Sequence, residues 1–166
     1  MNLLPVVILA GGLATRLRPL TLKIPKSLIE INHVPFIFHQ LKLLESNNIK
    51  KVIICTGFLS NQIVKAINNT SKINIDISFV NDGPTPLGTA GAIKKASHLL
   101  PENFFVLYGD SYLPCDYLKI QKHFIESNKL ALMTIYKNDS QWDKSNIEYN
   151  NKILNYDKKI ISGKMK

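Results

Sequence analysis

The hydrophobic positions of this 166-residue chain follow two alternating patterns. Short apolar runs, such as residues 5–9, are typical of strands that a parallel sheet buries on both faces. Between these runs, apolar residues recur three or four positions apart, which predicts amphipathic helices. Residues 73–79 instead alternate apolar and polar, as a half-buried strand does. The expected strands are residues 5–9, 51–55, 73–79, 104–108 and 130–136, and the expected helices are residues 35–46, 60–68, 90–100 and 117–127.

The regular succession of strands and helices predicts an α/β domain with a largely parallel sheet and helices on both faces. Residues 27–31 are expected to form a short extended piece, and residues 146–156 a hairpin that turns at two asparagines. Ser60 and Asp116 are expected to cap the helices that follow them, and Pro35 suits the first turn of its helix.

Composition excludes several classes of protein. An apolar fraction of 45%, with 8 Gly and 8 Pro, excludes a disordered tail and a fibrous repeat. The apolar run at residues 3–10 is too short to span a bilayer, and the N-terminus lacks the basic start of a signal peptide. Cys55 and Cys115 fit neither a metal motif nor a disulfide framework. We therefore expect a cytoplasmic protein with two buried free thiols and no membrane partner.

The net charge of +9 raises the question of nucleic-acid binding, and the placement of the charges argues against it. The lysines are scattered along the chain without a block of like charges or interleaved aromatic residues. The two arginines, Arg16 and Arg18, instead lie in one short loop. Because arginine is favoured for bidentate phosphate contacts, we expect the partner to be a small phosphorylated molecule rather than a nucleic acid.

The loop after the first strand has the features of a phosphate site. Residues 9–20 have the sequence LAGGLATRLRPL, and Pro-Lys-Ser follows at residues 25–27. Ligands of open α/β sheets bind beyond the carboxyl ends of the strands, and adjacent glycines let backbone N–H groups approach a phosphate. Arg16 adds a planar fork of donors and Lys26 a point charge. The pattern is neither a Walker A loop nor the dinucleotide motif. A tight turn with two solvent-facing cations is the alternative.

Two further segments contain candidate site residues. Residues 86–93, PLGTAGAI, place glycines at an expected helix start, where they would present backbone amides to a ligand or allow a close contact between helix and sheet. Asp110 follows a glycine at the carboxyl end of a strand. A hard oxygen ligand there suits Mg²⁺, whereas an isolated Gly-Asp would more often stabilise the next turn.

Together these segments resemble the sugar-1-phosphate nucleotidylyltransferases, also called NDP-sugar pyrophosphorylases. The family signature is Leu-Ala-Gly-Gly-x-Gly-Thr-Arg-Leu followed by Pro-Lys-Pro/Ser, and residues 9–17 and 25–27 match it except at Ala14. If position 14 needs a positive φ, alanine there costs about 1 kcal/mol. Leu-Gly-Thr-Ala-Gly resembles the nucleobase loop of guanylyltransferases for mannose- and heptose-type 1-phosphates. Gly109-Asp110 resembles the metal site, although Tyr108 before it departs from the commonest form.

The resemblance implies a fold, a reaction and a set of site residues. The fold would be a three-layer Rossmann-like (GT-A type) α/β domain that spans residues 1–166 as a single nucleotidyltransferase domain. The reaction would join an NTP, preferably GTP, to a sugar 1-phosphate, with Mg²⁺ as cofactor at Asp110 and with Arg16 and Lys26 as catalytic residues. The implied nucleotide-binding residues are Leu9, Ala10, Gly11, Gly12, Thr15, Arg16, Pro86, Gly88 and Thr89.

Members of the family continue beyond the point where this sequence ends. The expectation is therefore a C-terminally truncated chain that lacks part of the sugar site and a second metal carboxylate. A catalytically weak or inactive nucleotide-binding module is the alternative function, and a homo-oligomer is compatible with either. Trp142 is expected to anchor packing or to line a sugar pocket, and the four histidines show no spacing typical of a metal site.

Overall fold

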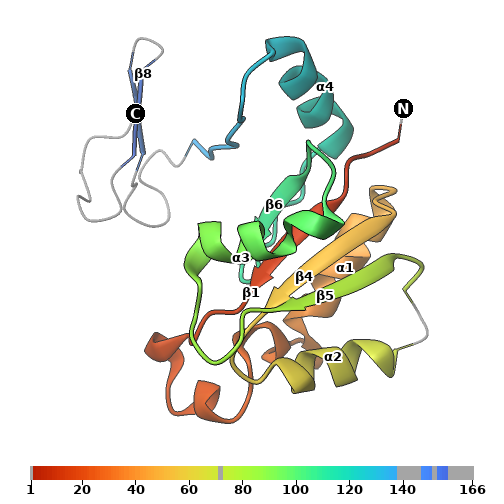
Figure 1. The fold of residues 1–166 in the computed structure, drawn as a ribbon, viewed down its shortest axis with the longest axis vertical. Helices are drawn as coiled ribbons and strands as arrows, with labels where there is room; N and C mark the ends of the chain where they lie inside the picture. Colours follow the sequence, from red (N-terminus) through yellow and green to blue (C-terminus); the bar gives the residue numbers. More distant parts are fainter. Residues whose placement is uncertain (1, 71–72, 138–146, 151–152, 157–166) are drawn as a thin grey trace. The chain divides into compact units, whose positions relative to one another are not determined.

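The computed structural model describes residues 2–70, 73–137, 147–150 and 153–156 (Figure 1). The chain divides into two compact units, Met1–Glu126 and Ser127–Lys166, and each is described by itself. The first unit contains a four-stranded sheet in the order β5-β4-β1-β6, and all of its pairings are parallel. Its strands are β1 (Val6–Ala10), β4 (Lys51–Thr56), β5 (Asp76–Asn81) and β6 (Phe105–Tyr108).

Helices cover both faces of this sheet, as the sequence pattern predicts. Val6 and Ile8 of β1 belong to one core cluster, together with residues of the first two α-helices. Val7 points to the opposite face and packs in a second cluster with Ala92 and Ala96. This alternation explains why β1 is apolar throughout. The helices are α1 (Phe36–Ser46), α2 (Ser60–Asn68), α3 (Gly88–Ala96) and α4 (Tyr117–Ser127) (Figure 1).

Short elements fill the long connection between β1 and α1. The expected extended piece at residues 27–31 is only partly observed, because a 3-10 turn takes its first half. The elements there are the 3-10 turns η1 (Thr15–Leu17), η2 (Leu20–Leu22) and η3 (Lys26–Leu28), followed by the antiparallel pair β2 (Glu30–Ile31) and β3 (Val34–Pro35). A fourth 3-10 turn, η4 (Ser97–Leu99), extends α3.

The expected helix caps meet different outcomes. Asp116 accepts a hydrogen bond from the backbone N–H of Lys119 at 2.9 Å, which confirms it as a cap of α4. Ser60 is not a cap, because it is the first residue of α2. Its buried hydroxyl is 2.7 Å from the hydroxyl of Thr56, so the two side chains satisfy each other instead. Pro35 directly precedes α1 rather than lying in its first turn.

Two strand predictions are wrong in part or in full. β6 is at the edge of the four-stranded sheet, so Val106 and Tyr108 are exposed rather than buried on both faces. The expected strand at residues 130–136 is not observed, although these residues are described. Leu130 and Tyr136 are exposed, and none of the described strands pairs with this segment. An apolar run does not form a strand without a partner that takes up its backbone hydrogen bonds.

The second unit contains the predicted hairpin. β7 (Ile147–Asn150) and β8 (Ile153–Tyr156) pair antiparallel, with Ile147 opposite Tyr156. Trp142 and the two residues between the strands lie outside the described residues. Across the described part of the chain, no helix has the length and apolar character needed to cross a membrane.

The two cysteines are free, as expected, but they differ in burial. Cys55 in β4 is buried, whereas Cys115 is only half-buried, so the expectation of two buried thiols is correct for one of them. Burial raises the pKa of both thiols, and that of Cys55 rises to about 11. Cys55 therefore stays protonated at neutral pH and is not a nucleophile.

Candidate active site

A pocket of about 640 Å³ lies at the carboxyl ends of the sheet strands, within the first unit. This volume is in the range of small-molecule sites, and the position is the one at which open α/β sheets bind ligands. The loops after β1, β5 and β6 all contribute to its wall. The structure brings together in this wall every site residue that the sequence predicts: Leu9, Ala10, Gly11, Gly12, Thr15, Arg16, Lys26, Pro86, Gly88, Thr89 and Asp110.

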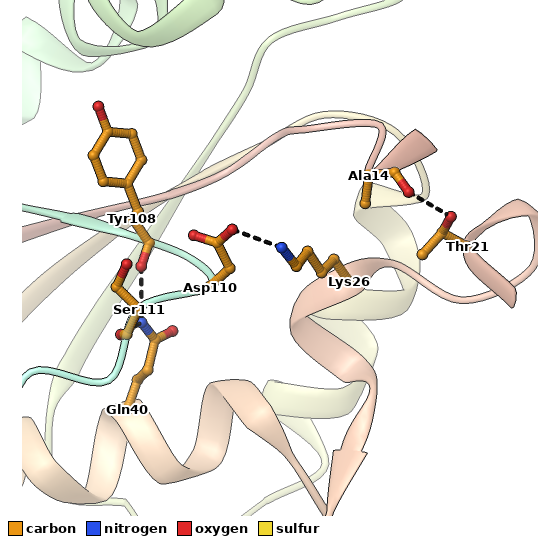
Figure 2. A network of polar contacts seen from close by, with 7 residues as sticks. All are labelled: Ala14, Thr21, Lys26, Gln40, Tyr108, Asp110 and Ser111. Carbon is orange, nitrogen blue, oxygen red and sulfur yellow. Dashed lines mark hydrogen bonds and ion pairs between the residues drawn. The ribbon is translucent and has the colours of Figure 1, made fainter. Parts of the chain in front are cut away.

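The loop after β1 is held in a strained conformation. Ala14 has φ 47° and ψ 46°, in the left-handed region that favours glycine. Its carbonyl oxygen accepts hydrogen bonds from the backbone N–H of Leu17 at 3.0 Å and from the hydroxyl of Thr21 at 2.9 Å (Figure 2). Thr21 is buried, so its hydroxyl fixes the turn from inside the loop. The position at which this chain departs from the family signature is therefore one where a positive φ is required.

Replacing Ala14 with glycine is expected to raise the free energy of unfolding by about 0.5–1 kcal/mol. A residue with a Cβ loses about 1–2 kcal/mol in the left-handed region, and the greater freedom of glycine in the unfolded chain offsets part of the gain. The melting temperature should rise by roughly 1–4 °C. Ala66→Gly within α2 is the matched control and should lower stability, because glycine is a poor helix former. An unchanged or lower melting temperature for Ala14→Gly would contradict the strain.

The glycines after the strands differ in what requires them. A Cβ on Gly57 would lie 2.6 Å from the carbonyl oxygen of Gly11, and a Cβ on Gly109 would lie 2.8 Å from the carbonyl oxygen of Leu9. These two positions need glycine because backbones from neighbouring strands meet there. A Cβ on Gly12 would meet no atom within 4 Å. Nothing in the fold requires glycine at position 12, and its backbone borders the open pocket.

Lys26 and Asp110 form an ion pair across the pocket. The Lys26 Nζ atom is 2.7 Å from Asp110 Oδ2, although the residues are 84 positions apart in the chain (Figure 2). Both side chains are about half exposed, at 41% and 46%. Pairs this exposed contribute about 0.2–1 kcal/mol to stability. The ion pair between Lys26 and Asp110 is therefore weak. A ligand that binds either side chain more strongly can break it.

Gln40 supports the turn that presents Asp110, and sequence reasoning missed it. Its buried side-chain amide donates hydrogen bonds from Nε2 to the carbonyl oxygens of Tyr108, at 2.9 Å, and Ser111, at 2.7 Å (Figure 2). These two residues flank the Gly109-Asp110 turn. The available signal was a glutamine on the apolar face of α1, three residues after Ile37 and next to Leu41.

Asp82 is a second pocket residue that sequence reasoning missed. It directly follows β5, lines the pocket and is only 8% exposed. Its carboxylate also contributes to the raised pKa of Cys55, after the larger effect of burial. The sequence did show an acidic residue close after an expected strand. Because residues 81–89 were expected to form a loop, nothing indicated that Asp82 would be buried.

The start of α3 forms another part of the wall. Gly88, its first residue, has φ 71°, so it occupies a conformation that disfavours side chains with a Cβ. The side chain of Leu87, which precedes this helix, makes no capping hydrogen bond, and the first-turn N–H groups of a helix have no partner within it. Pro86, Gly88 and Thr89 border the pocket at this point. Backbone donors are thus placed where a ligand would meet them.

Comparison with known proteins places the chain in a family. The model of the nucleotidyl transferase family matches residues 5–144. The catalytic subunit beta of mannose-1-phosphate guanylyltransferase from Xenopus tropicalis is 39% identical over 115 residues, which are 67% of this chain and 31% of that protein. The mannose-1-phosphate guanyltransferase of Yarrowia lipolytica is 36% identical over the same shares. The chain thus spans about a third of the length of these curated relatives.

The solved structures that resemble this chain are also nucleotidyltransferases. HddC from Yersinia pseudotuberculosis, also solved in complex with GMP-PN, is 35% identical with a TM-score of 0.65, over 75% of this chain and 53% of that one. A putative glucose-1-phosphate thymidylyltransferase from Bacillus anthracis has a TM-score of 0.66 at 22% identity, over 75% and 51%, and shows the shared Rossmann-like fold. By the family match, by sequence and by the fold that presents its pocket, this chain belongs to the nucleotidyl transferase family, among relatives that are sugar-1-phosphate nucleotidyltransferases.

Proposed function

We propose that this chain forms the nucleotide site of a sugar-1-phosphate nucleotidyltransferase, which converts an NTP and a sugar 1-phosphate into an NDP-sugar and pyrophosphate. One observation supports this most strongly. Three segments far apart in the sequence line one pocket together with Lys26, namely residues 9–16, the loop with Pro86, Gly88 and Thr89, and residues 108–110. Free nucleotides and sugar phosphates are the proposed partners, which is compatible with a cytoplasmic reaction.

The proposed reaction needs charge neutralisation more than proton transfer. A phosphate oxygen of the sugar 1-phosphate attacks the α-phosphorus, and the bond from that phosphorus to the bridging oxygen of the β-phosphate breaks as pyrophosphate leaves. No proton has to move, because nucleophile and leaving group are both phosphate anions. Arg16 would stabilise the departing pyrophosphate, and Lys26 would contact oxygens of the α-phosphate. The backbone of Gly11 and Gly12, which borders the pocket, would donate N–H groups to the triphosphate.

Magnesium fits the donor set of the pocket as a substrate-borne ion. Asp110 offers a half-exposed carboxylate, of which Oδ2 is paired with Lys26. Among the described side chains, no group of three or more His, Cys, Asp or Glu could hold a metal together. A single carboxylate completed by phosphate oxygens and water is the usual protein environment of Mg²⁺. Asp110 would hold the ion, which when bound would offset negative charge on the phosphates.

The preferred substrates are GTP and a mannose- or heptose-type 1-phosphate. The curated relatives are named for mannose 1-phosphate and guanylyl transfer, and HddC was solved with GMP-PN. Pro86, Gly88 and Thr89, which we assign to the nucleobase, lie in the pocket wall at the first turn of α3. These observations support the choice of base more directly than the choice of sugar.

A pyrophosphate-release assay tests the proposal. GTP, ATP, UTP and CTP are each combined with Mg²⁺ and with mannose, glucose or heptose 1-phosphate, and samples without a sugar phosphate serve as controls for hydrolysis. We expect release with GTP that depends on mannose or heptose 1-phosphate. Release confined to UTP would refute the guanine preference. Nucleotide binding without release from any pair would support the alternative of a nucleotide-binding module.

A further inference from the structure

The four charged side chains in the pocket wall cancel one another in formal charge. Arg16 and Lys26 are positive, and Asp82 and Asp110 are negative. This balance is unusual for a site that receives a triphosphate, which carries several negative charges. Arg16 makes no ion pair with the described residues, whereas Lys26 is paired with Asp110 at 2.7 Å. With that pair formed, Arg16 is the one cation of the described wall that is free to meet an anion.

Asp110 is the fixed partner of this ion pair, and Lys26 is the mobile one. The side chain of Gln40 ties the turn with Asp110 to α1. The N–H of Gly109 ties the same turn to β1, because it donates to the carbonyl oxygen of Leu9 at 2.9 Å. Lys26 instead reaches across from η3 on a flexible four-carbon side chain (Figure 2). Its ammonium group can therefore turn to another anion while the Asp110 carboxylate stays in place.

The ion pair responds differently to ligands with one kind of charge and to ligands with both. A metal-free triphosphate that draws Lys26 away leaves the Asp110 carboxylate unpaired beside its own negative charges. A metal ion alone at Asp110 leaves Lys26 unpaired beside a second cation. A metal-bound triphosphate offers a partner to each side chain, an ion to Asp110 and a phosphate oxygen to Lys26. Because like charges at close range repel, only the last exchange leaves no charge opposed.

We propose that the Lys26–Asp110 ion pair is a latch that selects the metal-bound form of the triphosphate over the metal-free form. The inference rests on the proposed function, which assigns Lys26 to phosphate and Asp110 to the metal. The latch couples the two halves of the ligand. A phosphate that takes Lys26 frees Asp110 for the metal, and by linkage a metal at Asp110 raises the affinity of Lys26 for phosphate by the same factor.

Metal-free inorganic tripolyphosphate tests the latch, because it offers a partner to Lys26 and none to Asp110. The 166-residue chain, Asp110→Asn, Lys26→Met and the double variant are titrated calorimetrically in EDTA at low ionic strength, where exposed charges are screened least. Asp110→Asn should bind tripolyphosphate more tightly than the unaltered chain, because it frees Lys26. The gain should be about 2- to 5-fold larger with Lys26 present than in the Lys26→Met background, a coupling that an ion pair this exposed can supply.

This cycle separates the latch from simple charge repulsion. A carboxylate that only repels phosphate would give equal gains in both backgrounds, and that result would overturn the inference while the proposed function stands. Asp76→Asn is the matched control, because it removes an equal charge at the exposed start of β5, the end of the strand away from the pocket. Its affinity for tripolyphosphate should stay within about 1.5-fold of that of the unaltered chain.

Mg²⁺ provides the second measurement. Added Mg²⁺ should raise the tripolyphosphate affinity of the unaltered chain and should not raise that of Asp110→Asn, in which Lys26 is already free. A loss of affinity on adding Mg²⁺ to the unaltered chain would overturn the inference.

The remaining outcomes are also decisive. If Lys26→Met binds no tripolyphosphate, the comparison of Asp110→Asn with Asp76→Asn decides: a gain confined to Asp110→Asn supports the latch, and no gain overturns it. If neither tripolyphosphate nor GTP binds the unaltered chain, with or without Mg²⁺, the proposed function fails and the inference fails with it.

Discussion

Lys26→Met is expected to reduce the rate of pyrophosphate release by about 10²- to 10³-fold at saturating GTP. Lys26 is the cation that η3 places across the pocket from Asp110, and removing one preorganised donor to a developing charge typically costs that much in rate. The ion pair lost with it is half exposed, so the free energy of unfolding should fall by no more than about 1 kcal/mol. Steady-state release of pyrophosphate and thermal melting measure the two effects.

Lys23→Met is the matched control for this variant. Lys23 follows η2 in the same loop, is exposed and is not part of the pocket wall. Its replacement removes an equal charge and should leave turnover within about 2-fold, which separates a local role from the effect of net charge. Comparable rate losses in both variants, or full turnover in Lys26→Met, would remove Lys26 from the proposed chemistry.

Gln40→Leu is expected to lower the free energy of unfolding by about 1–3 kcal/mol. The substitution removes both hydrogen bonds of the side-chain amide, so the carbonyl oxygen of Ser111 loses its donor. The carbonyl oxygen of Tyr108 still accepts the backbone N–H of Ser111 at 3.1 Å, so one acceptor is left unsatisfied, at a cost of about 1–3 kcal/mol. Denaturation in urea gives the change directly, and the melting temperature should fall by roughly 2–12 °C. The turn with Asp110 also loses its support, so turnover per folded molecule should fall as well.

Two other glutamines separate these effects. Gln62 is exposed and donates one hydrogen bond to the carbonyl oxygen of Lys23, so Gln62→Leu should change stability by less than about 1 kcal/mol. Gln121 is as buried as Gln40 but binds the N-terminal segment, through the N–H of Leu4 and the carbonyl oxygen of Asn2. Gln121→Leu should therefore destabilise the chain and leave turnover per folded molecule intact. Wild-type stability in Gln40→Leu would contradict its bracing role.

The pocket wall was predictable from the sequence because its parts are local motifs. A glycine-rich loop after a buried strand, a Gly-Asp after a second strand and a glycine at a helix start all concern residues adjacent in the chain. Because parallel strands have their carboxyl ends at the same edge of the sheet, the fold class alone predicts that these motifs lie close together. The α4 helix was also predictable from the sequence, because its apolar spacing and the cap at Asp116 both indicate a helix that begins at Tyr117.

The parts that sequence reasoning missed depend on contacts between distant residues. The hydrogen bonds of Gln40 span 68 and 71 positions, and nothing near α1 indicates which carbonyl groups its amide meets. The burial of Asp82 follows from the pairing of β5 with β4 and from the room that Gly11 leaves. Residues 130–136 show the converse case, because this apolar run suits a strand but no described strand pairs with it.

Phosphorus NMR of the reaction mixture tests whether this chain transfers the guanylyl group of GTP to a sugar 1-phosphate. The chain is incubated with GTP, Mg²⁺ and mannose 1-phosphate, and the phosphorus signals are followed over time. We expect the monoester signal of mannose 1-phosphate to disappear while a coupled diphosphate pair of GDP-mannose and the signal of pyrophosphate grow in equal amounts. Orthophosphate and GDP as the products, or GTP that binds and stays unchanged, would contradict it.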